Sequence, residues 1–301
     1  MKRTIIIVAA VVVVAVLAGC APAPDGETGR EIVSAEEALT LLADNDDIVL
    51  VDARPMPEYN EEHIDGAVNV SRADIVVMTP FPALLAPPEK IEENLGENGI
   101  SNDTRILVYD DNNNMDAARF WWTLKIYGHD NVQVVSGGYA ALQEAGASVG
   151  TEVPSVSSAT FTAEPVDESM MVDAKTIREH LDEPDPNVVL VDTRSEDEFV
   201  EGSIPGAIHI NYVGNNFSDG TFRPVRHIQI KYLGQDIDFD TEVWLYCLTS
   251  IRATQTYLAL YNAGYRNLRV YDGAWEEWSA NPMNPVFVPE TNVPVSEPDQ
   301  S

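Results

Sequence analysis

The sequence predicts an α/β protein in which one fold is used twice. Apolar runs typical of buried parallel strands alternate with helical patterns, and this order produces a mainly parallel sheet with helices on both faces. The run VLVDAR at residues 49–54 returns as VLVDTR at residues 189–194. A chain of 301 residues is long enough for two domains, each with its own core. We therefore expect two similar α/β domains in tandem.

The repeat continues beyond this first strand, and its spacing shifts along the chain. The segment GAV at 66–68 matches GAI at 206–208 with the same separation as the first pair. The runs that end at Tyr109-Asp110 and Tyr246-Cys247 are slightly closer together in the sequence. The segments GHDNV at 128–132 and GYRNL at 264–268 are closer still. Such repetition indicates one structural plan used twice, with the length differences in the loops.

The first domain is predicted over residues 34–149. A capping box, Ser34-Ala35-Glu36-Glu37, opens a helix that runs to about residue 43. The continuous apolar run at 48–52 ends in an acid and has the composition of a strand buried on both faces. Further strands are expected at 66–70, 105–109 and 132–135, and further helices at 57–62, 88–95 and 115–127.

The second domain is predicted over residues 171–284. It follows a stretch at 150–170 that has two prolines, a serine-rich run and no helical period, and that we interpret as a linker. Asp173 caps a helix that ends near residue 181, and the repeated strand lies at 188–192. A strand, a short loop and a helix are then expected within 243–261. Residues 285–301, rich in proline and acid, are expected to form an irregular tail.

The N-terminus has the features of an export signal. Lys2 and Arg3 precede an unbroken apolar run at 5–18, which is shorter than the roughly 20 residues that a membrane-spanning helix needs. The run ends in LAGC at 17–20, which resembles a bacterial-type lipobox. That resemblance implies removal of residues 1–19 and lipidation of Cys20, with an ordinary signal peptide as the alternative. We then expect a flexible tether over 20–33 and an extracytoplasmic lipoprotein, membrane-anchored in the cell envelope or periplasm.

The charge of the chain restricts its partners. The sequence has 49 acidic and 18 basic side chains, which give a net charge of −31. Nucleic acid is excluded as a partner, because its phosphates would be repelled over most of the surface. A soluble, self-repelling exterior is favoured, as in a high-salt habitat, and we expect a monomer. The five histidines show no metal-ligand spacing, so no metal or other cofactor is expected.

The cysteine count leaves Cys247 as the candidate reactive thiol. Cys20 and Cys247 are the only cysteines, and lipidation of the first leaves no internal disulfide. Cys247 lies at the carboxyl end of a predicted strand, where open α/β sheets bind ligands. Backbone amides of the following loop and helix would favour its thiolate, the reactive form. The alternative is that Cys247 is a small core residue.

Six sequence blocks together resemble a known family. They are the strand-plus-arginine blocks at 51–54 and 191–194, the glycine-centred blocks at 63–67 and 203–207, the loop at 247–252 and the block YDGAWEEW at 271–278. Over residues 34–149 and 171–280 the chain resembles the tandem-domain rhodaneses, the thiosulfate and 3-mercaptopyruvate sulfurtransferase family. In that family the first domain has usually lost its cysteine, and Asp110 stands at the matching position here.

The resemblance implies a catalytic second domain. Cys247 would take a sulfane sulfur from a small anionic donor, hold it as a persulfide and pass it to a thiophilic acceptor such as cyanide or a thiol. Arg252 and Arg194 are predicted to help bind the donor, although Arg252 could instead form a structural ion pair with Asp192. The predicted cradle of the sulfur also includes the loop residues Leu248, Thr249, Ser250 and Ile251.

Two departures from the family pattern leave the donor open. Ser250 stands where family loops often have glycine, so the turn must form without that freedom. Leu248 and Thr249 are neutral where some thiosulfate-type loops are basic, which is closer to the polar loops of mercaptopyruvate sulfurtransferases. Two other functions compete with the enzyme. A sulfane-sulfur carrier or sensing module fits the same residues, whereas a phosphatase of this fold would need five residues between cysteine and arginine, and four are present.

Overall fold

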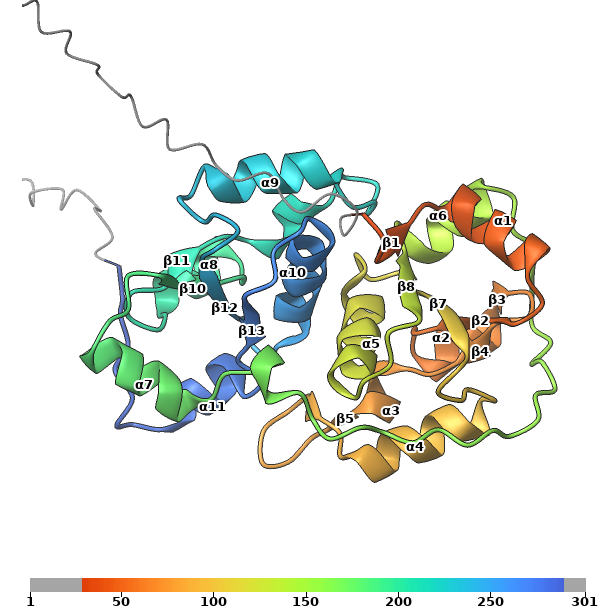
Figure 1. The fold of residues 1–301 in the computed structure, drawn as a ribbon, viewed down its shortest axis with the longest axis horizontal. Helices are drawn as coiled ribbons and strands as arrows, with labels where there is room; N and C mark the ends of the chain where they lie inside the picture. Colours follow the sequence, from red (N-terminus) through yellow and green to blue (C-terminus); the bar gives the residue numbers. More distant parts are fainter. Residues whose placement is uncertain (1–28, 290–301) are drawn as a thin grey trace, which may run out of the picture.

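The structure, a computed structural model, describes residues 29–289. The predicted signal peptide, the lipidation site at Cys20 and most of the predicted tether and tail lie outside the described residues. Two α/β halves lie side by side, with the N-terminal half from red to yellow and the C-terminal half from green to blue (Figure 1). No helix within residues 29–289 has both the length and the apolar character needed to span a bilayer.

The N-terminal half is built on five parallel strands. Their order is β1 (Ile32–Val33), β8 (Val132–Val135), β7 (Arg105–Tyr109), β2 (Ile48–Asp52) and β4 (Val68–Asn69). The register pairs Asp52 with Tyr109, so the carboxyl ends of the two central strands are level. Asp110, the counterpart of Cys247, therefore begins a loop at the edge where such sheets bind ligands.

Helices cover both faces of this sheet, as the sequence predicted. Leu50 and Leu107 face one apolar cluster with α1 and α6, whereas Val51, Ile106 and Val108 face the other cluster with α4 and α5. This alternation is the two-residue period of a strand buried on both sides. The helices are α1 (Ala35–Asp44), α2 (Met56–Glu61), α3 (Arg72–Ile75), α4 (Pro88–Glu97), α5 (Met115–Ile126) and α6 (Gly138–Glu144).

The C-terminal half repeats the plan with four parallel strands. Their order is β11 (Ile208–His209), β10 (Val188–Asp192), β12 (Glu242–Tyr246) and β13 (Leu268–Val270). A fifth strand is reduced to one parallel bridge between Met171 and Val270, at the edge where β1 lies in the first half. The helices are α7 (Ala174–Asp182), α8 (Glu196–Glu201), α9 (Val225–Leu233), α10 (Ile251–Asn262) and α11 (Ala274–Ala280).

Short elements complete the fold. Two antiparallel pairs join β3 (His63–Ile64) to β9 (Val149–Gly150) and β5 (Val76–Val77) to β6 (Leu84–Leu85), and two 3-10 helices are η1 (Glu168–Met170) and η2 (Tyr212–Asn215). The predicted linker packs on the first half instead of standing free. Phe161 is buried, and the Ala159 amide donates to the Gly96 carbonyl of α4 at 2.9 Å.

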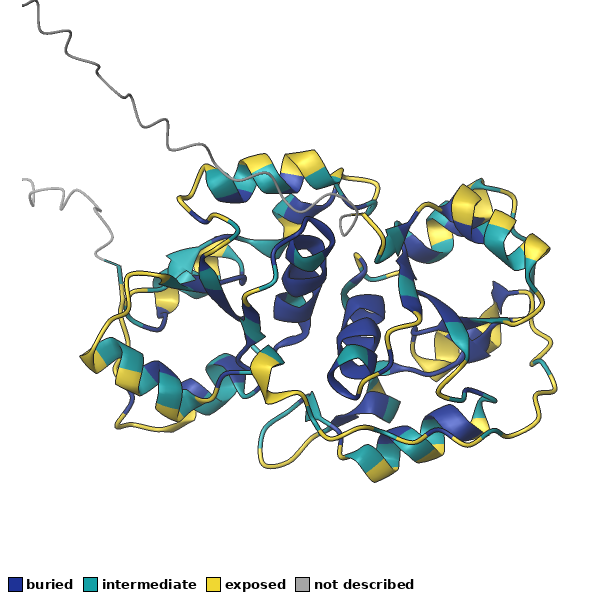
Figure 2. Cartoon of the chain, viewed as in Figure 1, coloured by how far each residue is buried: buried dark blue, intermediate teal, exposed yellow. Residues whose placement is uncertain are grey.

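The two halves meet through α5 and α10, which are dark along most of their length in Figure 2. Each helix covers its own sheet with one side and contacts the other helix with the opposite side. The ring of Trp121 on α5 lies 6.1 Å from that of Tyr257 and 5.4 Å from that of Tyr261, both on α10. Both helices are buried on nearly every side, and their apolar side chains belong to one continuous core that joins the two halves.

Candidate active site

The loop that carries Cys247 joins β12 to α10. The strand ends at Tyr246 and the helix begins at Ile251, so Arg252 already lies in the first helical turn. Cys247 is buried, with 1% of its surface exposed, and belongs to the core cluster at the carboxyl end of the sheet. Its position is therefore the predicted ligand-binding edge, and its burial limits access to the sulfur.

The next helix along the chain holds the backbone of this loop. The amide of Trp275 donates to the Cys247 carbonyl at 3.0 Å, and the amide of Glu276 donates to the Leu248 carbonyl at 3.2 Å. Both amides lie in the first turn of α11, where a helix has N–H groups without partners of its own. The N-terminus of α11 thus fixes two loop carbonyls and leaves the loop amides free to face a ligand.

Ser250 shapes the loop with its side chain turned into the protein. Its φ of 66° is left-handed, which confirms that the loop makes its turn at this position without glycine. The Ser250 hydroxyl accepts a bond from Arg119 Nη1 at 2.8 Å, and its single proton is shared between Asp272 Oδ1 at 2.9 Å and the Thr249 carbonyl at 2.5 Å. Ile251 packs in the core, while Leu248 and Thr249 are half-buried. Contact of the Ser250 or Ile251 side chain with substrate is therefore not supported, and binding through the loop amides stays a prediction.

Arg252 forms an ion pair, but its partner is Glu198 on α8 and not Asp192. Nη1 and Nη2 lie 2.6 and 2.7 Å from the two carboxylate oxygens of Glu198. Burial alone would lower the pKa of Arg252, but Glu198 and the nearby Cys247 together raise it. The hydrogen bonds from Arg252 in turn lower the pKa of Glu198 to about 2. Arg252 is thus a fixed positive charge beside the sulfur.

Arg194 lies in a buried ion pair at the end of β10, and its contact with substrate stays a prediction. Its guanidinium is buried, donates to both oxygens of Asp192, and reaches the Gly202 carbonyl at 2.6 Å. The first half contains the same arrangement, in which Arg54 binds Asp52 and the Glu62 carbonyl. Because the pair is present in both halves and only one has the cysteine, it serves the fold.

Tyr212 belongs to the site, although the sequence reasoning did not select it. It begins η2 at the end of β11, close to Cys247, Arg252 and Glu198. Burial raises the pKa of this phenol, and Cys247 and Glu198 raise it further against the opposing effect of Arg252. The internal repeat could have identified the position, because the alignment of GAV at 66–68 with GAI at 206–208 also places Arg72 opposite Tyr212.

The corresponding loop of the first half binds a carboxylate, that of Asp110. The loop from Asp110 to Asn114 is one residue longer than its counterpart. Asp110 Oδ1 accepts the amides of Asn112 and Asn114, and Oδ2 accepts those of Asp116 and Ala117, all within 2.7–3.0 Å. Burial, together with the nearby Asp116, raises the pKa of Asp110 to about 7 against the opposing effect of the bonds from Ala117, Asn112 and Asn114. Loop and helix amides therefore form an anion site that the chain fills with its own carboxylate.

In the second half the corresponding amides have no such occupant. They belong to residues 249–253, and the hydrogen bonds within the described part of the chain give them no nitrogen or oxygen acceptor. Cys247 stands where Asp110 supplies the carboxylate. A sulfur anion on Cys247 would thus meet the same set of donors.

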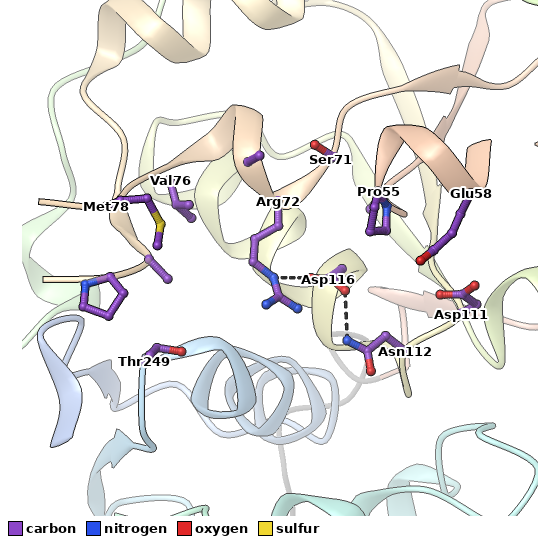
Figure 3. A pocket seen from close by; sticks show the side chains of 14 residues that line it. Pro55, Glu58, Ser71, Arg72, Val76, Met78, Asp111, Asn112, Asp116 and Thr249 are labelled. Atoms are coloured by element: carbon purple, nitrogen blue, oxygen red, sulfur yellow. Dashed lines mark hydrogen bonds and ion pairs between the residues drawn. The ribbon is translucent and has the colours of Figure 1, made fainter. Parts of the chain in front are cut away.

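A cavity of about 730 Å³ lies between the Cys247 loop and the first half of the chain. Figure 3 shows Thr249 at one end of it, facing Arg72, Asp116 and Asn112 of the first half. Arg72 is paired with Asp116, and Asn112 Nδ2 donates to Asp116 Oδ2 at 3.1 Å. Among the described residues, Thr249 is the member of the Cys247 loop that lines the cavity. The cavity is therefore adjacent to the loop but is walled mainly by the first half.

Comparisons with known proteins agree with this geometry. A family model described as a rhodanese-like domain matches residues 34–145 and again 173–281. The chain belongs to the rhodanese family. The loop between the central strand and its helix thus occurs twice in this chain, with the carboxylate of Asp110 in the first domain and the thiol of Cys247 in the second. Within residues 29–289, no three His, Cys, Asp or Glu side chains are grouped to hold a metal ion.

Two curated rhodanese relatives cover most of the chain. A Haloferax volcanii protein assigned as a thiosulfate sulfurtransferase is 31% identical over 238 residues, 73% of this chain and 81% of the relative. A Pseudomonas aeruginosa protein assigned as a 3-mercaptopyruvate sulfurtransferase is 29% identical over 290 residues, 86% of this chain and 98% of the relative. The protein is accordingly a sulfurtransferase.

A solved structure has the same tandem fold. The anaerobic ergothioneine biosynthesis enzyme from Chlorobium limicola, in complex with its natural substrate trimethyl histidine, superposes with a TM-score of 0.75 at 23% identity. The match covers 85% of this chain and 69% of that one. At this identity the likeness concerns the rhodanese fold alone.

Proposed function

We propose that the protein transfers a sulfane sulfur through a persulfide on Cys247. The observation that carries this proposal is the comparison of the two loops. In the first, four amides hold the Asp110 carboxylate, and in the second Cys247 replaces that carboxylate. A thiolate or persulfide anion would be stabilised by the same amides, with Arg252 as the adjacent cation. The donor is thiosulfate or 3-mercaptopyruvate.

The proposed reaction has two displacement steps. With thiosulfate, the Cys247 thiolate attacks the outer sulfur, the S–S bond breaks and sulfite leaves with the electron pair. With 3-mercaptopyruvate, the C–S bond breaks and the pyruvate carbanion takes up a proton. Cyanide or a thiolate then attacks the outer sulfur of the persulfide, and the Cys247 thiolate is regenerated.

A paired assay tests the proposal. Thiocyanate formation is measured with each donor and cyanide, and intact mass is recorded after exposure to donor alone. We expect turnover with at least one donor and a gain of about 32 Da, one sulfur, which Cys247→Ser abolishes. A persulfide that forms once without turnover would instead support the carrier alternative. Wild-type protein that gains no sulfur from either donor would contradict both.

We also propose that the enzyme acts outside the cytoplasm on a lipid anchor at Cys20. The basic residues, apolar run and LAGC sequence at the N-terminus support this proposal. Protein extracted from membranes should have the mass of a chain that begins at Cys20 and carries a diacylglyceryl group. A soluble, unmodified product cleaved at another bond would show that the segment is an ordinary signal peptide.

A further inference from the structure

One side chain of the first half reaches the catalytic loop of the second. Arg119 lies in the middle of α5 and is 0% exposed. Its Nη1 donates to Ser250 Oγ and to Asp272 Oδ1, each at 2.8 Å, and its Nη2 donates to the Ala83 carbonyl at 3.1 Å. A buried guanidinium loses its hydration, so it must be paired in this way to be tolerated.

The bonds of Arg119 connect the parts that shape the site. Ser250 is the last loop residue before α10, and Asp272 lies just before α11, whose amides bind the carbonyls of Cys247 and Leu248. Asp272 Oδ2 also accepts the Leu85 amide of β6 at 2.7 Å. Arg119 therefore fixes the end of the loop and, through Asp272, the turn that holds its beginning.

The loop needs this support because Ser250 has an unfavourable backbone conformation. A residue other than glycine at φ 66° pays a steric cost that persists only where the surroundings impose it. The first half has Asn114 at the same place, with φ 62°, and asparagine adopts this conformation more readily. Serine lacks that tolerance, and the bonds of its hydroxyl with Arg119, Asp272 and the Thr249 carbonyl supply the constraint.

We propose that Arg119 is a positioning residue for sulfur transfer. Through Ser250 and Asp272 it holds the Cys247 loop in the conformation that aims the loop amides at the sulfur. The first half thus acts on catalysis through one named side chain, beyond its general packing. The inference rests on the proposed function of Cys247, since it is the sulfur on that thiol that the loop would stabilise.

Substitutions of Ser250 test the proposal without removing a buried charge. Ser250→Ala keeps the strained backbone and loses all the hydroxyl bonds, whereas Ser250→Gly loses the same bonds but adopts the left-handed conformation freely. We expect Ser250→Ala to lower kcat by roughly 10- to 100-fold with a smaller change in KM, because misplaced catalytic groups cost rates of that order. Ser250→Gly should recover most of the loss. If the two variants have equal activity, whether both match wild type or both are impaired, the proposal is overturned.

Substitutions of Arg119 complete the test. Arg119→Lys keeps the charge and loses the fork of donors, and the pair Arg119→Met with Asp272→Asn removes both charges together. Trp121→Phe is the matched control, since Trp121 lies on the same helix and contacts α10 away from the loop. We expect both Arg119 variants to lose kcat while the control loses only stability. A loss of kcat that merely follows the melting temperature in all three would contradict the proposal.

A second readout separates this inference from the proposed function. The rate of iodoacetamide alkylation of Cys247 reports the state of the loop without any sulfur donor. We expect this rate to change in Ser250→Ala and Arg119→Lys and to stay at the wild-type value in Trp121→Phe. If wild-type protein forms no persulfide but alkylation still shifts, the proposed function fails and the positioning of the loop stands. Unchanged alkylation in an enzyme that forms the persulfide overturns the positioning role alone.

Discussion

At the scale of single residues, the two halves differ most at the position shared by Asp110 and Cys247. The amides around Asp110 stabilise its charged form, yet burial and the nearby Asp116 outweigh them and raise its pKa to about 7. The amides therefore stabilise an anion only in part, because the buried surroundings disfavour its charge. Cys247 has a compensating cation in Arg252, whereas the corresponding helical residue of the first half is Asp116.

The raised pKa of Asp110 predicts a pH-dependent contribution to stability. In the unfolded chain an aspartate ionises near its usual value of about 3.9, while the folded protein keeps the proton up to about 7. The folded state thus binds more protons between these values, and wild-type stability falls as the pH rises through this window. Asp110→Asn cannot titrate and should be free of this dependence.

Urea unfolding of both proteins at about pH 5 and pH 7.5 measures the effect. The stability of wild type relative to Asp110→Asn should fall by about 2 kcal/mol between the two conditions. Asp130→Asn serves as the control, because its carboxylate is 85% exposed. A difference between wild type and Asp110→Asn that does not change with pH would contradict the prediction.

At the scale of elements, the strand–loop–helix unit explains why one half carries the thiol. Both units place a loop at the carboxyl end of the central strand, and both turn into their helix through a left-handed residue. The first loop is longer by one residue, and Arg72 and Asp116 occupy the places of Tyr212 and Arg252. The first half therefore has the ion pair Arg72–Asp116 where the second half has Arg252–Glu198.

These differences predict that one substitution will not create a second active site. A cysteine at position 110 would have the amides but would face Asp116 in place of an arginine, with Asp111 beside it. The double variant Asp110→Cys, Cys247→Ser should transfer sulfur at least about 100-fold more slowly than wild type. The thiocyanate assay with both donors measures this, and Cys247→Ser alone gives the background. Transfer near the wild-type rate would show that the first loop is competent.

At the scale of the whole molecule, net charge opposes the entry of an anionic donor. The chain carries a charge of −31, and the local positive charge of Arg252 acts only over a short range. Salt screens the general repulsion, because the Debye length falls from about 30 Å at 0.01 M ionic strength to about 3 Å at 1 M. Close contacts between the sulfur, the amides and Arg252 are screened much less.

We therefore predict that salt accelerates the capture of donor. Between low and high ionic strength, kcat/KM for thiosulfate should rise by about threefold or more, since a field of this sign slows encounter with anions. The rise should be smaller for 3-mercaptopyruvate, which carries one negative charge where thiosulfate carries two. Steady-state kinetics with each donor across a salt series measures the effect. A fall in kcat/KM for thiosulfate with salt would mean that local positive charge dominates capture.

Much of the fold and the central residue of the site followed from the sequence. The central strands, helices α1, α4, α5, α7 and α10, the internal repeat and the placement of Cys247 at a strand end all depend on patterns within short segments, whereas α3 and α6 were not predicted. Hydrophobic periodicity and a recurring order of short motifs are local properties, so they can be recognised without knowledge of the packing. A turn at Ser250 without the freedom of glycine was expected from the family resemblance, and the structure shows that this turn is left-handed.

The partners of the charged side chains were decided only by the tertiary structure. Arg252 pairs with Glu198, 54 residues away, and Arg119 with Asp272, 153 residues away. In a chain with 49 acids, sequence alone offers many equivalent partners for each arginine. Sheet order and the packing of α5 on α10 select one of them, because a buried charge is stable only beside the acceptor that the fold brings within hydrogen-bond distance. The roles of Tyr212 and Arg119 depend on that selection, and no local pattern encodes it.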